Sequence, residues 1–182
     1  MVTITTTATQ TNSKWSVINL IQAGVITVSD KGSKGQRVDE SGPALKKILE
    51  KNMDARVDSM IIVPDEQDII EKTLIYYTDV LNLDLVLTTG GTGFAPRDVT
   101  PEATKSILEK DVPGISEVIR SRSLAITPKA MLSRGISGIR KTTLIINLPG
   151  SPKGATESIS FVMDALPHGL AILKEEAKEC AR

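Results

Sequence analysis

The chain has 182 residues, with 22 basic and 22 acidic side chains, 40% hydrophobic residues and 3% aromatic residues. This length suits one globular domain, which buries roughly 70% of the surface of its unfolded chain and needs no disulfide or metal to hold its core. The balanced charge argues against nucleic-acid binding through a generally basic surface, and no apolar run approaches the ~18 residues of a membrane helix. Cys180 is the only cysteine and His168 the only histidine, which excludes an internal disulfide and a histidine-rich metal site and favours a cytoplasmic protein.

The first 22 residues differ in composition from the rest of the chain. Met1 to Gln22 opens with a threonine-rich stretch, and its apolar part, Val17 to Ile21, is interrupted by Asn19. A secretory signal needs a continuous apolar segment, which is missing here. We therefore expect residues 1–22 to form a flexible leader or extension, and residues 23–182 to form a single domain.

From Ala23 onward, short apolar runs alternate with longer segments of helical period, which is typical of α/β architecture. The apolar runs predict strands at residues 25–28, 60–63, 85–87 and 143–148. The helical periods predict helices over residues 43–49, 66–75, 100–108 and 113–126, and two more after residue 155 that separate at Pro167.

Three of these strands end in loops with unusual chemistry. The loops begin at Ser29-Asp30, at Thr88 and at Leu148, and the second of them reads Thr-Thr-Gly-Gly-Thr-Gly through Gly93. In an open α/β sheet, ligands collect beyond the carboxyl ends of the parallel strands, so we expect the three loops to converge on one site. A glycine-rich turn can present backbone N–H groups to a phosphate, although the same residues also suit a plain tight turn. Neither a Walker A sequence nor G-x-G-x-x-G is present.

Two aspartates near this loop allow more than one interpretation. Asp65 lies at a strand-to-helix junction and is as well suited to capping the helix as to catalysis. Asp98 and Arg97 come before Thr100-Pro101-Glu102, a sequence that predicts a capped helix start with Thr100 as the cap. A carboxylate beside a phosphate site is unfavourable without a cation between them, so Asp98 suggests Mg²⁺. Asp39 and Glu40 are expected to be solvated or capping residues.

With these residues in view, the chain resembles the molybdopterin adenylyltransferase family of molybdenum-cofactor biosynthesis, the MogA and MoaB type, and is similar to the G domain of gephyrin and its plant counterpart. The resemblance covers about residues 23–171. It rests on five motifs in register: residues 28–30 with 39–43, residues 64–66, residues 87–93, residues 97–103 and residues 147–152. It implies a three-layer α/β/α sandwich with a mostly parallel central sheet.

The resemblance also implies a reaction, in which molybdopterin attacks the α-phosphate of ATP to give adenylyl-molybdopterin and pyrophosphate. By matching positions it implies that Asp65 and Asp98 form the essential acidic pair, acting through Mg²⁺, and that Thr92 and Ser123 contact the substrate. Further substrate-binding residues are expected at Ser29, Asp30, Thr89, Gly90, Gly91, Gly93, Arg97, Pro149, Gly150 and Ser151. The implied assembly is a homotrimer, or a hexamer in some members, which hands its product to a molybdate-inserting enzyme. No nucleic acid or membrane is expected as a partner.

Two departures from the family pattern leave alternatives open. Pro96-Arg97 stands where some members carry two arginines, and the chain is short after Pro167, which brings it nearer in outline to the MoaB type. One alternative is a non-catalytic molybdopterin-binding or trimeric scaffold module. The other is a nucleotide pyrophosphatase like the amino-terminal domain of the competence-damage protein. Retention of both Asp65 and Asp98 favours the transferase over the scaffold.

Overall fold

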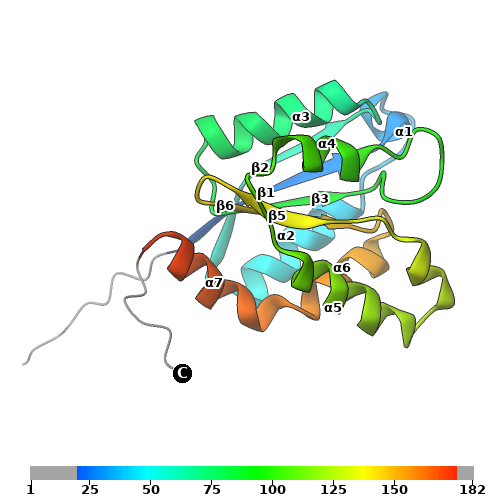
Figure 1. Ribbon diagram of the computed structural model, residues 1–182. Coiled ribbons are helices and arrows are strands. Elements are labelled where there is room, and N and C mark those ends of the chain that lie inside the picture. Colours follow the sequence, from blue (N-terminus) through cyan, green and yellow to red (C-terminus); the bar gives the residue numbers. More distant parts are fainter. Residues whose placement is uncertain (1–19, 176–182) are drawn as a thin grey trace, which may run out of the picture.

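A single six-stranded sheet forms the centre of the molecule in the computed structural model, which describes residues 20–175 (Figure 1). The strand order is β2-β1-β3-β6-β5-β4. The first four strands in this order are parallel, and β5 and β4 complete the sheet in antiparallel pairing. The strands are β1 (Ile21–Val28), β2 (Ala55–Val63), β3 (Leu85–Thr89), β4 (Lys110–Asp111), β5 (Ser137–Arg140) and β6 (Thr143–Leu148).

Helices cover both faces of the sheet, so the expected three-layer α/β/α sandwich is confirmed (Figure 1). One outer layer holds α3 (Gln67–Ile75), which continues into a π-helical turn (Tyr76–Val80), and α4 (Thr100–Ile107). The other layer holds α2 (Ser41–Asn52), α5 (Pro113–Leu124), α6 (Pro152–Ser160) and α7 (Leu166–Leu173). Three short helical segments complete the structure: α1 (Asp30–Ser33), a 3₁₀ turn at Pro128–Leu132 and another at Met163–Ala165.

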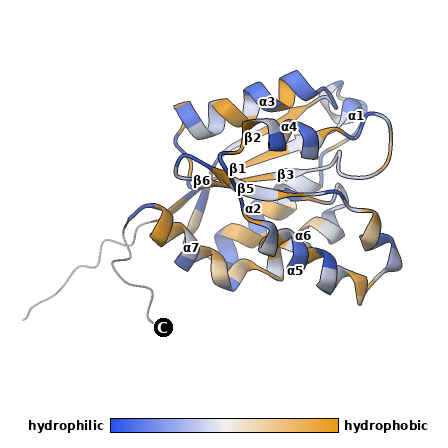
Figure 2. Ribbon diagram, in the orientation of Figure 1, coloured by the Kyte–Doolittle hydropathy of each residue, from blue (hydrophilic) through white to orange (hydrophobic). Residues whose placement is uncertain are grey.

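The sequence of each central strand explains why it lies in the middle of the sandwich. β3 and β6 are buried at every position, as expected for parallel strands that are covered on both faces. Successive residues of β1 face opposite layers: Val25 packs in the core under α2 and α6, and Ile26 packs in the core under α3 and α4. The helices carry both hydrophobic and hydrophilic residues (Figure 2), which suits helices with one face on a sheet.

The strand order creates a crevice between β1 and β3. The chain passes from β1 to β2 on one side and then returns to β3 on the other side of β1. The connections that follow β1 and β3 therefore diverge at the carboxyl end of the sheet, which is the usual ligand position in doubly wound folds. The loops after Val28 and Thr89 lie at this position.

Several predicted boundaries require correction. β1 begins at Ile21, so Ile21 and Gln22 belong to the sheet and not to the leader; the leader's residues 1–19 lie outside the described part of the chain. The last two helices separate at residues 161–165, and Pro167 lies in the first turn of α7. The antiparallel strands β4 and β5 were not predicted, because one has two residues and the other contains Gly138 and Arg140.

Candidate functional site

The three loops singled out in the sequence meet at one end of the sheet, the right-hand end in Figure 1. The Gly90 N–H donates to the carbonyl of Leu148 (3.2 Å), and the Thr89 hydroxyl donates to the carbonyl of Pro149 (2.7 Å). Gly150 approaches Gly90 so closely that a Cβ on Gly150 would lie 3.2 Å from the Gly90 Cα. The loop after β1 joins them through Val28, whose carbonyl faces Gly90.

The glycine loop adopts a backbone that other residues accept poorly. Gly90 has φ +103° and Gly91 has φ +62°, and a side chain on either would run into neighbouring atoms. Thr100 fixes the loop by donating its hydroxyl to the Gly90 carbonyl (2.9 Å). The prediction that Thr100 caps α4 is therefore wrong, because the capping position belongs to Val99 and the Thr100 side chain is used on the loop.

Asp30 and Asp65 bridge the ends of β1 and β2. The Asp65 carboxylate accepts from the Asp30 backbone N–H (2.7 Å), and the Asp30 carboxylate accepts from the Asp65 N–H (3.2 Å). The capping position of α3 belongs to Glu66, so Asp65 does not cap that helix. Arg97 donates from Nε and Nη2 to the two carboxylate oxygens of Asp30 (2.6 and 2.9 Å) and lies 3.6 Å from the Glu66 carboxylate.

These contacts move the pKa values of the two aspartates in opposite directions. The Arg97 guanidinium holds the pKa of Asp30 below its usual value, because the bidentate pair favours the charged form. Burial raises the pKa of Asp65, and the negative charges of Asp30 and Asp98 act in the same direction. A half-buried carboxylate with a raised pKa beside other carboxylates is the kind of group that active sites use.

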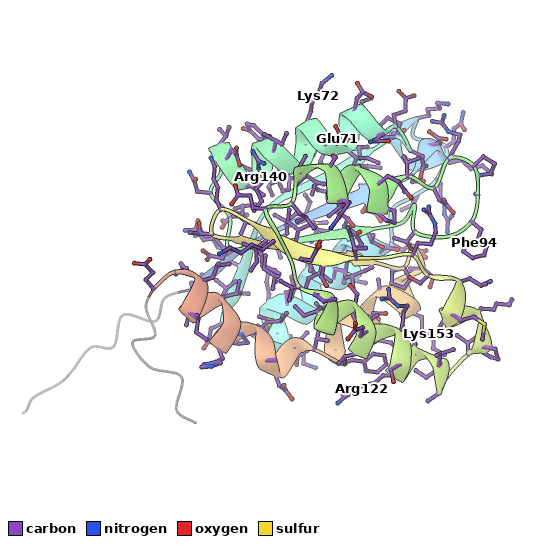
Figure 3. The ribbon with its side chains drawn as sticks, in the orientation of Figure 1. Glu71, Lys72, Phe94, Arg122, Arg140 and Lys153 are labelled. Atoms are coloured by element: carbon purple, nitrogen blue, oxygen red, sulfur yellow. The ribbon has the colours of Figure 1, made fainter. Side chains whose placement is uncertain are left out.

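Asp98 lies on the segment between the glycine loop and α4. One of its carboxylate oxygens accepts from the Ala95 N–H (3.0 Å), and the same oxygen lies 2.9 Å from where a Cβ of Gly93 would stand. Phe94 is 67% exposed at the outer end of this segment, where Figure 3 shows it pointing away from the sheet. Among the described residues there is no group of three or more His, Cys, Asp or Glu side chains arranged to hold a metal ion.

Two cavities lie beside the loop that follows β6. One of about 320 Å³ is at the crevice between β1 and β3, and the other of about 290 Å³ lies between α5, α6 and the 3₁₀ turn at Pro128–Leu132. Ser151 lines both. Of the predicted site residues, the first cavity also contains Ser29, Thr89 and Gly150, and the second contains Thr92, Gly93, Ser123 and Pro149.

The remaining predicted residues, Asp30, Asp65, Gly90, Gly91, Arg97 and Asp98, line neither cavity. Gly90 and Gly91 form the bend of the glycine loop, and the other four form an acidic cluster with one arginine next to it: Asp30, Asp65, Asp98 and Arg97. Gly91 brings the glycine loop next to the acidic cluster, because a Cβ at this residue would lie 3.2 Å from Asp65 Oδ1. The structure therefore joins all the predicted site residues into one contiguous region, with two cavities and one acidic cluster.

Two residues shape this region that the sequence did not assign to the site: Asp39, which was expected only to be solvated or capping, and Arg134, which was not singled out. Asp39 accepts from the N–H groups of Ser41 and Gly42 (2.9 and 3.0 Å) and from the Thr27 hydroxyl (2.7 Å), so it tethers the start of α2 to β1. The sequence predicted a solvated or capping residue here. The carboxylate does bind the first N–H groups of α2, while the N-cap position itself belongs to Glu40, and the place of Asp39 on the first cavity was not foreseen. Arg134 donates to the loop of Thr92 to Asp98, and no local pattern in the sequence marks it.

Comparison with known proteins identifies the family to which this chain belongs. Residues 24–168 match the family described as a probable molybdopterin binding domain, and the chain belongs to that family.

No helix of residues 20–175 has the length and hydrophobicity needed to cross a lipid bilayer.

Individual relatives are similar over most of their length. A molybdopterin adenylyltransferase of Helicobacter pylori is 47% identical over 149 residues, which are 81% of this chain and 85% of the relative. That of Escherichia coli K12 is 43% identical over 81% of this chain and 76% of its own. The crystal structure of the molybdopterin biosynthesis enzyme MoaB from Thermus thermophilus superimposes with a TM-score of 0.81 and 48% identity, covering 85% of this chain and 97% of that one.

Proposed function

We propose that this protein transfers the adenylyl group of ATP to molybdopterin. An oxygen of the terminal phosphate of molybdopterin attacks the α-phosphorus of ATP and forms a new P–O bond. The bond from the α-phosphorus to the oxygen bridging to the β-phosphate breaks, and pyrophosphate leaves. The products are adenylyl-molybdopterin and pyrophosphate, and no covalent intermediate with a protein side chain is needed.

The observation that carries this proposal is the pair of cavities that share Ser151, because a two-substrate transfer needs two adjoining sites. The relatives named as molybdopterin adenylyltransferases, at 43% and 47% identity, support the choice of substrates. A scaffold module would need neither cavity.

We assign the pterin to the cavity that contains Thr92 and Ser123, and the nucleotide to the cavity at the crevice between β1 and β3. Thr92 is buried, and its hydroxyl makes no hydrogen bond with the described residues, so it remains able to donate to a ligand. In the nucleotide cavity, the Ser29 and Ser151 hydroxyls accept from the N–H groups of Gly32 and Gly154. Each keeps its own O–H for a phosphate oxygen.

Asp65 and Asp98 are the acidic pair of the proposed reaction, and their chemistry fits Mg²⁺. Mg²⁺ is commonly held by one or two carboxylates together with substrate phosphates, so a site of three protein ligands is not required. In each of the two carboxylates only Oδ2 accepts a hydrogen bond from the described residues, which leaves Oδ1 available. Mg²⁺ would neutralise charge on the phosphates when it is bound. Arg97, held by Asp30, supplies a further positive charge beside the acidic pair.

The wider setting of the proposed function follows the family resemblance. We propose a cytoplasmic homotrimer, with a hexamer as the alternative, that passes its product to a molybdate-inserting enzyme. Residues 1–19 are proposed to be a leader that the reaction does not require.

The proposal is tested by incubating the purified chain with Mg-ATP, with and without molybdopterin, and identifying the products by mass spectrometry. Pyrophosphate and adenylyl-molybdopterin formed only in the presence of the pterin would support the transferase. AMP released without the pterin would favour a nucleotide pyrophosphatase, and molybdopterin binding without any nucleotide product would favour the binding module.

A further inference from the structure

Arg134 lies on the connection between the 3₁₀ turn at Pro128–Leu132 and strand β5, and it contacts the segment from Thr92 to Glu102 in four places. Its backbone N–H donates to the carbonyl of Thr92 (2.9 Å), and Nε donates to the carbonyl of Gly93 (2.7 Å). Nη2 donates to the carbonyl of Asp98, and Nη1 pairs with the carboxylate of Glu102. The side chain is 34% exposed, so most of it is removed from water.

The segment from Gly93 to Asp98 has few other attachments. It contains one internal turn, in which the Asp98 N–H donates to the Ala95 carbonyl (2.8 Å) and the Ala95 N–H donates to the Asp98 carboxylate. Within residues 20–175, the hydrogen bonds from this segment to other parts of the fold are those of Arg97 to Asp30 and those of Arg134. Arg134 therefore holds both ends of the segment from Gly93 to Asp98.

Only an arginine suits these acceptors. Three different nitrogens of the planar guanidinium each serve a separate oxygen, and the oxygens belong to residues 93, 98 and 102. A lysine has a single nitrogen and cannot span the three positions, and glutamine lacks both the charge and the fork. Hydrogen bonds to a charged donor are also stronger than neutral ones, which favours a rigid loop.

Arg134 also connects the loop to the wall of the proposed pterin cavity. Its neighbours Leu132 and Ser133 line that cavity, and so do Thr92 and Gly93, to which Arg134 donates hydrogen bonds. One side chain thus fixes the distance between the cavity wall and the turn that presents the Asp98 carboxylate.

We propose that Arg134 is a positioning residue for the adenylyl transfer. It holds the Thr92–Asp98 segment so that the pterin cavity and the Asp98 carboxylate keep their relative placement, and it does this without touching either substrate. The inference rests on the proposed function, which supplies the reaction, but whether Arg134 holds the loop can be measured independently of that reaction.

The test compares Arg134→Gln and Arg134→Lys with Arg56→Gln, a matched control whose guanidinium pairs with Asp58 on strand β2. Amide hydrogen exchange is followed by mass spectrometry in a peptide covering residues 93–99. Arg134→Gln is expected to speed exchange of the Ala95 and Asp98 amides by roughly tenfold or more while the strand amides stay protected, because three hydrogen bonds to a charged group are lost. Arg134→Lys should lie between the parent and Arg134→Gln, and Arg56→Gln should match the parent.

Two functional measurements separate positioning from a merely structural role. In Arg134→Gln we expect kcat to fall by roughly tenfold or more, with the KM for Mg-ATP within about twofold and molybdopterin bound several-fold more weakly. In an Asp98→Asn background the same change should lower kcat little further, because residues that act through one another are not additive.

Unchanged exchange in the residue 93–99 peptide would overturn the proposal, and so would full additivity with Asp98→Asn. If the parent chain binds molybdopterin but never adenylylates it, the proposed reaction fails. The exchange and molybdopterin-affinity measurements would still decide whether Arg134 holds the loop and the cavity.

Discussion

Gly90 lies where β3 runs into the glycine loop, and its replacement by alanine tests whether the loop bends tightly at this residue. At φ +103° an L-residue is strained by about 1.5 kcal/mol, as in other left-handed backbone conformations. The new Cβ would also fall far inside van der Waals contact with the carbonyl oxygen of Val28. Because that oxygen belongs to the backbone of a central strand, relief requires the strand or loop to move, at about 2.5 kcal/mol for overpacking.

We therefore expect Gly90→Ala to lower the free energy of unfolding by about 4 kcal/mol. Gly35→Ala is the matched control, because Gly35 also has a positive φ of +70° but no atom within 4 Å of its Cβ position. Strain alone should cost about 1 kcal/mol there. The difference of about 3 kcal/mol corresponds to roughly 6–12 °C in melting temperature for a chain of this size.

Urea denaturation of the two variants at equal protein concentration, followed by circular dichroism, measures this difference. Equal destabilisation of the two variants would refute the close approach of the glycine loop to β1. Such a result would also remove the structural reason for the glycine at position 90.

Three further predictions concern the acidic cluster, the pterin cavity and an ion pair far from the site. The pKa of Asp65 is raised in the folded protein, so its carboxylate makes stability fall as pH rises from the unfolded pKa toward the raised one. Asp65→Asn should therefore melt at or above the parent temperature at pH 7, and its stability should depend less on pH over that interval. Thr92→Ala or Ser123→Ala should each weaken molybdopterin binding by about 1 kcal/mol, roughly fivefold, in a fluorescence titration; unchanged affinity in both would contradict the assignment of this cavity. Asp79 is paired with Arg140, which lowers the pKa of Asp79. The pair therefore stabilises the fold above the unfolded pKa of Asp79, and this stabilisation is lost as pH falls through the lowered pKa. Asp79→Asn should cost about 2 kcal/mol at pH 7 and progressively less in acid, as measured by urea unfolding, and an equal cost at all pH values would contradict it.

The central part of the fold could be predicted from the sequence because its signals are strong and local. The run Thr143–Leu148 is entirely buried in the structure, and its bounds match the predicted strand. Strand β2 was predicted too short, since its first half alternates between buried and exposed positions and carries Arg56 and Asp58 on an edge. Such an edge strand owes its conformation to pairing with β1, which no local pattern encodes.

The site was predictable to the extent that its residues follow strands directly. Thr89 is the last residue of β3, and Ser29 and Gly150 lie within two residues of the ends of β1 and β6, so the topology alone brings them to one edge. The capping interpretation of Asp65 was plausible because any carboxylate before a helix suits it, and only the three-dimensional contact with Asp30 removes it. Arg134 is 36 residues away from Asp98 along the chain, and such a long-range contact leaves no sequence signal.

In the proposed reaction, Asp65 and Asp98 act in adenylyl transfer and not in holding the fold. Single-turnover formation of adenylyl-molybdopterin, with the parent chain and with Asp65→Asn and Asp98→Asn at saturating Mg-ATP, tests this directly. The asparagine variants should fold and bind molybdopterin like the parent but form product at least about 100-fold more slowly, because the charge that holds a cation on the phosphates is lost. Product formation by either variant at close to the parent rate would contradict the claim for that residue.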